Sequence, residues 1–132
     1  MTVILDRAGI LNRAEILDSA EDLGAPAAWH RVCPLEELEP AWGEAALIAG
    51  RQVALFRTGA SEVYAVSQQD PATLANVMAR GIIGSRGSRP TIASPLHKEV
   101  YDLETGQCFT NPELSLDAFA TRVVDGFIEV EL

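Results

Sequence analysis

The sequence has few of the residues that metal centres and secreted folds require. Among its 132 residues there are only two cysteines, Cys33 and Cys108, and two histidines. Two cysteines allow at most one disulfide, and a cytoplasmic protein would keep both thiols reduced. No run of about 18 apolar residues exists that would span a membrane. The N-terminus scatters charges among its apolar residues, unlike a secretory signal, so we expect a cytoplasmic location.

Clustered positive charge is also scarce. Ten Lys and Arg residues stand against 19 Asp and Glu residues, and the net charge is −9. Binding to nucleic acid needs a basic face that neutralises phosphates, so we expect no nucleic-acid partner. What the chain does contain is apolar residues, which make up 48% of it. This composition is globular, and the length fits one domain with a substantial core.

The first 27 residues differ in pattern from the rest. Their apolar positions fit a short amphipathic helix only weakly, and the stretch GAPAA at Gly24–Ala28 is typical of a linker. We therefore predict a weakly helical N-terminal extension over residues 1–27, mobile or docked outside the core. The remaining residues, 28–132, are predicted to form one domain.

From residue 28 onward, apolar residues recur with a period of two, which is typical of short strands. Strands of this length and spacing predict an all-β fold, an antiparallel barrel or sandwich. The clearest hairpin signal is Asp125-Gly126, because this pair readily takes the positive φ angles of a type I′ turn. Glycines and a proline break the pattern between Ser67 and Thr91, where we predict a long loop.

Two loops have the layout of an iron–sulfur site without its thiols. The first reads VSQQDPATLANVMARG and places Asp-Pro-Ala at Asp70–Ala72. The second reads ASPLHKEVYDLETGQC and places Ser-Pro-Leu-His at Ser94–His97. With these loops, the segment from about Trp29 to Leu132 resembles a Rieske-type [2Fe–2S] ferredoxin domain. Such domains hold their cluster in a Cys-x-His and a Cys-x-x-His loop, through two thiolates and two imidazoles.

The resemblance places Asp70 and Ala72 at the ligand positions of the first loop, and Ser94 and His97 at those of the second. Only His97 matches a ligand of the family. A sulfide-bridged iron pair needs soft thiolates, which the other three side chains do not replace. We therefore predict that the cluster ligands are lost and that these vestigial positions bind no metal. Because buried polar groups need partners, we expect Asp70 and Ser94 to lie close and to satisfy each other or nearby backbone amides, with Lys98 or His97 as alternative partners of Asp70.

Two other sites remain open from the residues alone. His30 and Cys33, with one histidine and one cysteine elsewhere, supply the ligand count of a Rieske centre. Side chains three apart on a strand face opposite ways, however, which disfavours this set. Ser94, His97 and Asp102 lie close in sequence as a hydrolytic triad would, but no Gly-x-Ser-x-Gly elbow accompanies them.

A narrower resemblance rests on a set of short motifs. They are Tyr64-Ala65-Val66, Asp70-Pro71, Ala79-Arg80-Gly81, Ala93-Ser94-Pro95-Leu96 and Asp125-Gly126. With them, about the last four-fifths of the chain is similar to the small subunit of bacterial assimilatory NAD(P)H-dependent nitrite reductase. The resemblance implies a partner, the large subunit, which carries siroheme, a [4Fe–4S] cluster and FAD, uses NAD(P)H and reduces nitrite to ammonia.

The chain itself would then bind no cofactor and would not be catalytic alone; it would support assembly, stability or substrate access of the large subunit in nitrate assimilation. Two alternatives from other classes remain. One is a genuine Rieske-type ferredoxin that carries electrons, and the other is an interaction module for an unrelated partner.

Charge placement adds a hypothesis about docking. Between Pro71 and Lys98 there is no Asp or Glu, whereas the interval holds four cations, at Arg80, Arg86, Arg89 and Lys98. In a Rieske-like fold these residues would surround the tip of the vacated site. We hypothesise that they dock on an acidic surface of the large subunit, where charge orients the encounter more than it strengthens binding. A solvated loop of chance composition is the alternative.

Overall fold

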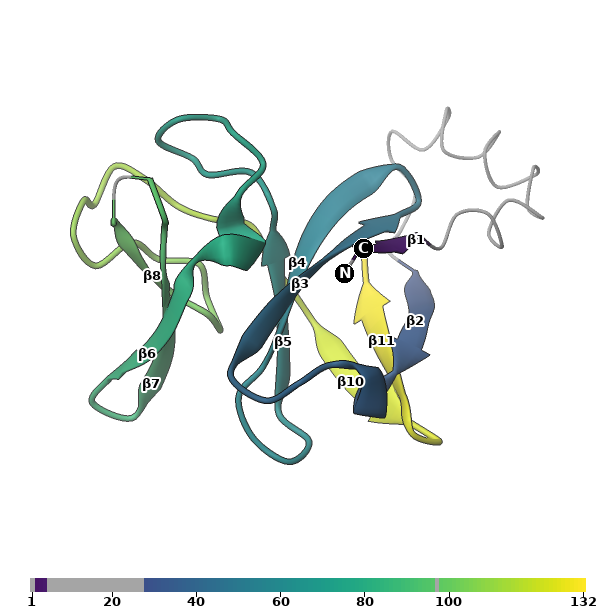
Figure 1. The fold of residues 1–132 in the computed structure, drawn as a ribbon. Helices are drawn as coiled ribbons and strands as arrows, with labels where there is room; N and C mark the ends of the chain where they lie inside the picture. Colours follow the sequence, from purple (N-terminus) through teal and green to yellow (C-terminus); the bar gives the residue numbers. More distant parts are fainter. Residues whose placement is uncertain (1, 5–27, 97) are drawn as a thin grey trace.

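The computed structural model describes residues 2–4, 28–96 and 98–132. Its strands are β1 (Thr2–Ile4), β2 (Trp29–Pro34), β3 (Trp42–Ile48), β4 (Arg51–Arg57), β5 (Val63–Ser67), β6 (Ile82–Arg86), β7 (Arg89–Ala93), β8 (Val100–Asp102), β9 (Ala118–Phe119), β10 (Thr121–Val124) and β11 (Phe127–Glu131), and its short 3-10 helices are η1 (Leu35–Glu37) and η2 (Met78–Arg80) (Figure 1). Within these described ranges, no helix is long and apolar enough to cross a membrane.

Strand β4 lies at the centre of the molecule, and both of its faces are buried. Val53 and Leu55 belong to one hydrophobic core, and Ala54 and Phe56 belong to a second. Successive side chains of a strand point to opposite faces, so one strand supplies both cores. A strand buried on both faces needs apolar residues at every position rather than at alternate ones, which explains the unbroken run VALF in this strand.

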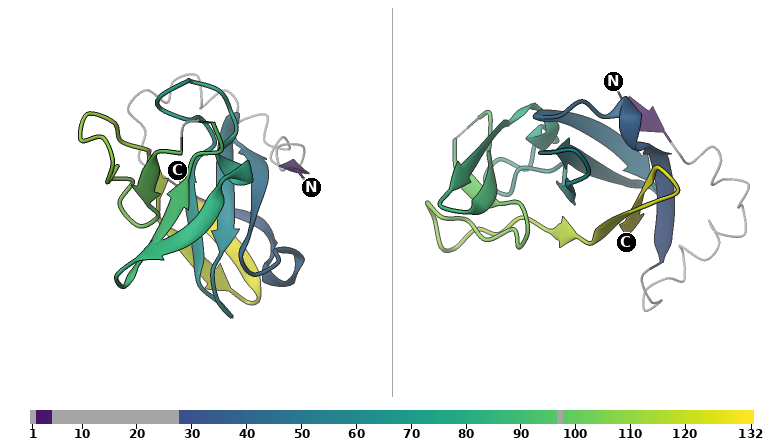
Figure 2. Two further views of the ribbon diagram at one scale, coloured as in Figure 1. Left: turned by 60° about the vertical axis from the view of Figure 1, so that its left-hand side comes forward. Right: turned by 90° about the horizontal axis from the view of Figure 1, so that it is seen from below.

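Three sheets surround these two cores. The largest has the order β1-β3-β4-β5-β9, and the sheet β10-β11-β2 packs against it over the first core. The third sheet, β6-β7-β8, lies at the opposite end of the molecule and covers the second core (Figures 1 and 2). Of the pairings between described strands, only that of β1 with β3 is parallel. The predicted all-β, antiparallel fold is confirmed.

The predicted hairpin near the C-terminus is confirmed, whereas the predicted long loop is partly wrong. Asp125 and Gly126 have φ angles of 53° and 79°, and they join β10 to β11. The interval from Ser67 to Thr91 contains a further hairpin, because β6 pairs with β7 around a turn at Gly87, whose φ is 66°. Gly84 within β6 hides this hairpin in the sequence, since glycine is rare in strand interiors.

The start of the predicted extension forms a strand of the largest sheet. Thr2–Ile4 form β1, which pairs in parallel with β3 in the register Thr2 with Ala45 and Ile4 with Leu47. The edge of the largest sheet is therefore covered by a segment that the sequence pattern did not assign to a strand. The weak helix predicted further along the extension lies outside the described residues.

Candidate functional site: two loops joined by Asp70 and Ser94

The first loop is a tight turn built on Asp70. The amide of Asp70 donates to the carbonyl of Ala75 at 2.8 Å, and the amide of Leu74 donates back to the carbonyl of Asp70 at 2.7 Å. The Asp70 carboxylate also accepts a hydrogen bond from the amide of Ala72 at 2.9 Å, through Oδ1. Aspartate readily bonds its own backbone two residues on, so it shapes this turn without a metal.

The second loop repeats the same pattern around Ser94. The amide of Ser94 donates to the carbonyl of Glu99 at 2.9 Å, and the amide of Lys98 donates to the carbonyl of Ser94 at 3.0 Å. The hydroxyl of Ser94 accepts from the amide of Leu96 at 3.2 Å. Asp70 and Ser94 thus hold equivalent places in two similar turns, and both turns close on a residue of positive φ, with 69° at Leu74 and 58° at Lys98.

One buried hydrogen bond joins the two loops. The Ser94 hydroxyl donates to Oδ2 of Asp70 at 2.7 Å, and the two residues are 1% and 0% exposed. The prediction that they lie close and satisfy each other is confirmed. Among the residues that the structure describes, Asp70 forms no ion pair with Lys98, and the alternative partner His97 lies outside those residues.

Hydrogen bonds keep the Asp70 carboxylate charged despite its burial. Burial is the largest single influence and raises its pKa, but the hydrogen bonds from Ser94, Ala72 and Thr73 together lower the pKa of Asp70 below its ordinary value. A carboxylate with several donors is stabilised in its charged form. The loops are therefore fixed by a charge-assisted bond, which is stronger than a bond between neutral groups.

The space beneath the loops is filled by the second hydrophobic core. Tyr101 and Met78 are both fully buried there, and Cys108 is 3% exposed. The Tyr101 hydroxyl has no hydrogen-bond partner within the described part of the chain, and burial raises its pKa. The Cys108 sulfur lies 3.4 Å from the hydroxyl of Thr110. Packed side chains thus occupy the interior, as protein interiors require.

These residues do not fit a [2Fe–2S] cluster. The two loops supply a carboxylate, a hydroxyl and a methyl group at three of the four ligand positions, and iron–sulfide clusters need thiolates. Both cysteines are free thiols, but Cys33 lies in the first core and Cys108 in the second. Burial, with smaller contributions from two glutamates, raises the pKa of Cys33 to about 11, so its thiol stays protonated. Within the described ranges, no three His, Cys, Asp or Glu residues form a metal site.

The hydrolytic triad does not assemble either. The Ser94 hydroxyl donates a hydrogen bond to Asp70, and Asp102 forms an ion pair with Arg89. His97, the third member, lies outside the described residues. A serine whose proton is directed at a buried carboxylate and whose side chain is 1% exposed offers no reachable nucleophile.

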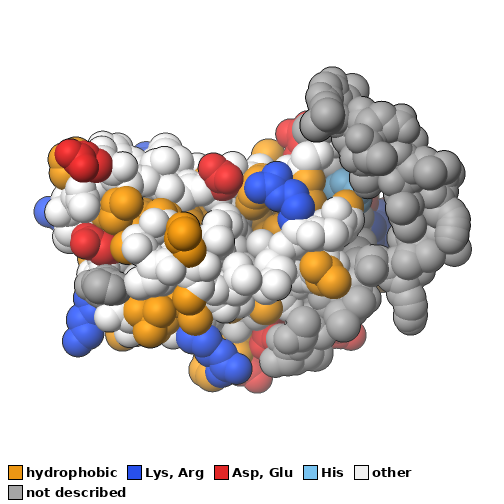
Figure 3. All heavy atoms as spheres, turned by 90° about the horizontal axis from the view of Figure 1, so that it is seen from above, with side chains coloured by type: hydrophobic (Ala, Val, Ile, Leu, Met, Phe, Trp, Pro, Cys, Tyr) orange, Lys and Arg blue, Asp and Glu red, His pale blue; other side chains and the backbone are white. Residues whose placement is uncertain are grey.

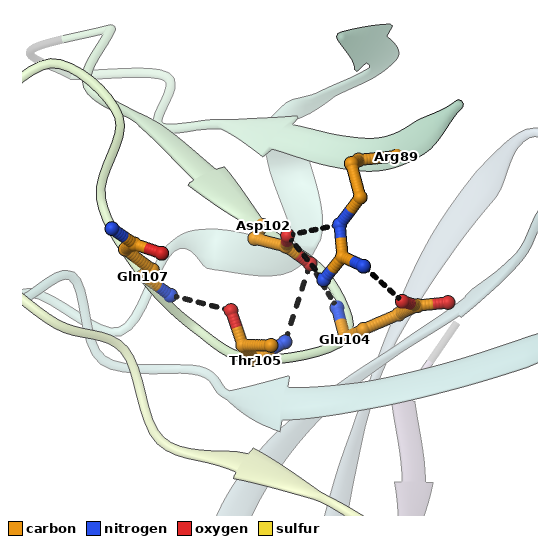
Figure 4. Close-up of polar contacts among 5 residues, drawn as sticks. All are labelled: Arg89, Asp102, Glu104, Thr105 and Gln107. Atoms are coloured by element: carbon orange, nitrogen blue, oxygen red, sulfur yellow. Dashed lines mark hydrogen bonds and ion pairs between the residues drawn. The ribbon is translucent and has the colours of Figure 1, made fainter. Parts of the chain in front are cut away.

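The four predicted docking cations have different environments. Arg89 Nε and Nη2 both lie 2.7 Å from Oδ2 of Asp102, and its Nη1 lies 3.1 Å from Oε1 of Glu104 (Figure 4). Its charge therefore holds the buried Asp102 and the turn after β8. Arg86 stacks over the ring of Phe109, with its guanidinium carbon 4.9 Å from the ring centroid. Arg80 and Lys98 are exposed.

Apolar side chains at the same end were missed in the sequence. Leu74, Ile82 and Leu96 are 65%, 70% and 53% exposed, on the first loop, at the start of β6 and on the second loop. Figure 3 views the molecule from the side of the loops and shows hydrophobic side chains at the surface of this end, beside Lys and Arg side chains. No sequence signal distinguishes these three exposed residues from apolar residues of the core, because their exposure depends on the backbone conformation.

Known proteins share this architecture. The family described as "Rieske-like [2Fe-2S] domain" matches residues 28–131. The "Nitrite reductase (NADH) small subunit" of Salmonella typhimurium is 35% identical over 103 residues, which are 77% of this chain and 95% of that protein. The protein of the same name from Escherichia coli K12 is 33% identical over the same shares. The Klebsiella oxytoca "Nitrite reductase [NAD(P)H] large subunit" is 34% identical over 102 residues, only 11% of its length.

Solved structures agree with these relatives. The NMR structure of the E. coli protein NirD has a TM-score of 0.73 and 31% identity, covering 80% of this chain and 97% of that one. The ferredoxin of carbazole 1,9a-dioxygenase from Nocardioides aromaticivorans has a TM-score of 0.69 and 27% identity, covering 78% and 96%. The chain therefore belongs to the Rieske-like domain family and, within it, to the small subunits of NADH nitrite reductase.

Proposed function

We propose that this chain is the small, non-catalytic subunit of an assimilatory NAD(P)H-dependent nitrite reductase of the cytoplasm, and that it holds no iron–sulfur cluster of its own. The supporting observation is the buried hydrogen bond between Ser94 and Asp70. It joins the two loops at positions where a Rieske cluster would need thiolates. Without a bound redox centre the chain cannot transfer electrons, so its role is to bind another protein through its surface.

The partner is a large subunit that carries siroheme, a [4Fe–4S] cluster and FAD and reduces nitrite to ammonia. The Klebsiella relative supports this pairing, because a stretch similar to this chain forms part of a protein named as a large subunit. We infer that this separate chain docks on its large subunit as the similar stretch does within the Klebsiella protein. The small subunit then supports assembly, stability or substrate access of the large one.

The docking face is the end of the molecule that carries the two loops. Arg80 and Lys98 supply its exposed positive charge, whereas Arg86 lies at the far end of the β6–β7 hairpin, opposite Arg89. The whole chain has a net charge of −9. An acidic surface on the large subunit would attract this end and repel the rest, which orients the encounter. Arg89 takes a structural role in this proposal, because reversing its charge would leave the buried Asp102 beside a like charge.

The division of the chain is part of the proposal. The domain begins near residue 28, where the family match also begins, and residues 1–27 form an extension that docks through β1 on the edge of the largest sheet. Deleting residues 1–27 would expose that edge and leave the two loops intact, so we expect the shortened chain to fold and still bind the large subunit. Circular dichroism and pull-down with the large subunit measure both.

Ultraviolet–visible absorption with iron and sulfide quantification tests the proposal. The chain, purified without oxygen and after reconstitution with iron and sulfide, is expected to stay colourless and to bind the large subunit in size-exclusion chromatography. A brown chain with two irons per molecule would favour the ferredoxin alternative and overturn the proposal. A colourless chain that does not associate with its large subunit would favour an interaction module with an unrelated partner.

A further inference from the structure

We propose that Leu74 is the main apolar anchor of the docking face, held in a strained backbone conformation so that its side chain points outward, and that Leu96 is the second anchor. The inference rests on the proposed function, because the partner is the large subunit. The anchors are apolar, whereas the docking residues predicted from the sequence are basic.

The conformation of Leu74 is unfavourable for its residue type. Its φ is 69°, a region that bulky residues rarely adopt because the side chain crowds the following carbonyl. Two hydrogen bonds between Asp70 and the segment Leu74–Ala75 hold the turn in place. Among the described residues with positive φ, four are glycines and the other non-glycines are Ala41, Ala49, Lys98 and Asp125, so Leu74 is the one with a bulky apolar side chain. Strained residues of this kind cluster at functional sites.

The exposure of Leu74 is a second feature that does not stabilise the isolated chain. The Leu74 side chain is 65% exposed, so it gains little from burial within the chain itself. Leu74 thus has a strained backbone and makes little packing contact within the chain. Burial against a partner would account for both features. An apolar side chain that fills a pocket on another protein stabilises the complex by removing its surface from water.

Leu96 supplies the second anchor from the other loop. It is 53% exposed, and its amide is held by the Ser94 hydroxyl. The hydrogen bond between Ser94 and Asp70 fixes the two loops to each other, so both leucines are presented on one rigid support. A preorganised surface loses less conformational entropy on binding than a flexible one.

The partner surface that receives the two leucines belongs to the large subunit and has an apolar pocket with an acidic rim. Lys98 stands at the position of the second loop that Leu74 holds in the first, and Arg80 begins the segment toward β6. Both cations are exposed, and the sequence between Pro71 and Lys98 contains no Asp or Glu. Apolar anchors beside exposed cations match a pocket whose rim is negative.

The Leu74→Gly variant separates the contribution of the Leu74 side chain to binding from its effect on folding stability. Glycine adopts positive φ without steric cost, so the variant is expected to keep or raise the melting temperature. Loss of the side chain is expected to weaken binding of the full-length chain to the large subunit by about tenfold or more. Leu74→Met keeps an apolar side chain of similar size and is expected to bind within about threefold of the wild type.

Ala49→Gly is the matched control. Ala49 is exposed in the turn between β3 and β4 and has a φ of 50°, so the substitution relieves the same kind of strain on a different loop. It is expected to raise the melting temperature similarly and to leave binding unchanged. Leu96→Ala is expected to weaken binding in the same direction as Leu74→Gly.

The outcomes separate this inference from the proposed function. Wild-type affinity in Leu74→Gly overturns the anchor while leaving the association of the subunits intact. A lower melting temperature in Leu74→Gly overturns the claim of backbone strain. If the wild-type chain does not bind the large subunit in isothermal titration calorimetry, the proposed function fails and the anchor fails with it.

Discussion

Removing the hydroxyl that joins the two loops tests how the domain is held without a cluster. In Ser94→Ala, Asp70 loses the 2.7 Å hydrogen bond to its Oδ2 and keeps the hydrogen bonds from Ala72 and Thr73. A hydrogen bond to a charged group contributes about 1.5–3 kcal/mol, and leaving a buried carboxylate partly unsatisfied lies at the upper end. We expect a loss of about 2–3 kcal/mol in the free energy of unfolding at pH 7.

The loss of unfolding free energy in Ser94→Ala should become smaller as the pH falls, because it depends on the ionisation of Asp70. In the wild type the folded-state pKa of Asp70 is lowered, so its contribution to stability is present above the ordinary aspartate value and is lost as the pH falls through the folded pKa. Without the Ser94 hydroxyl, fewer hydrogen bonds offset the effect of burial, so the folded-state pKa of Asp70 rises. The variant therefore takes up a proton at a higher pH than the wild type, and the difference between them narrows toward pH 4.

Urea denaturation followed by tryptophan fluorescence measures both effects. The free energy of unfolding is compared at pH 7 and pH 4.5 for the wild type, Ser94→Ala and Ser88→Ala. Ser88 is exposed in the turn between β6 and β7, so its substitution controls for loss of a serine and should change little. A loss below about 0.5 kcal/mol for Ser94→Ala, within the usual range of surface substitutions, would refute the reasoning. So would a loss that stays constant between the two pH values.

Three further substitutions, the first with a matched control, test other contacts in the same part of the molecule. Gly106→Ala is expected to destabilise by more than about 3 kcal/mol in thermal unfolding, because a Cβ there would lie 1.7 Å from a backbone oxygen at a φ of 82°; Gly87→Ala, with nothing within 4 Å, should cost only about 1 kcal/mol. Arg89→Met should lower the melting temperature because Asp102 loses its only ion-pair partner in the described chain. Tyr101→Phe should leave stability unchanged or raise it, because the buried hydroxyl has no partner among the described residues; a loss above about 1 kcal/mol in urea denaturation would contradict this.

Much of the fold follows from short-range features of the sequence. The hairpin at Asp125-Gly126 is readable because the pair itself favours positive φ, whatever surrounds it. The hairpin of β6 and β7 was missed for the opposite reason. Glycines at Gly84 and Gly87 argue locally against strands, and the pairing is stabilised by tertiary packing, with Ile92 of β7 opposite Tyr101 of β8 in the second core.

The sequence by itself determined the chemistry of the two loops. Donor atoms belong to residue types, so the carboxylate of Asp70, the hydroxyl of Ser94 and the methyl group of Ala72 cannot supply thiolates at these three positions in any fold. Only the tertiary structure decided what these groups and their neighbours do. It brings Asp70 and Ser94, 24 positions apart, within 2.7 Å, turns Arg89 onto Asp102, and exposes Leu74. Those outcomes depend on backbone angles and on contacts between distant segments, which no local pattern of residues specifies.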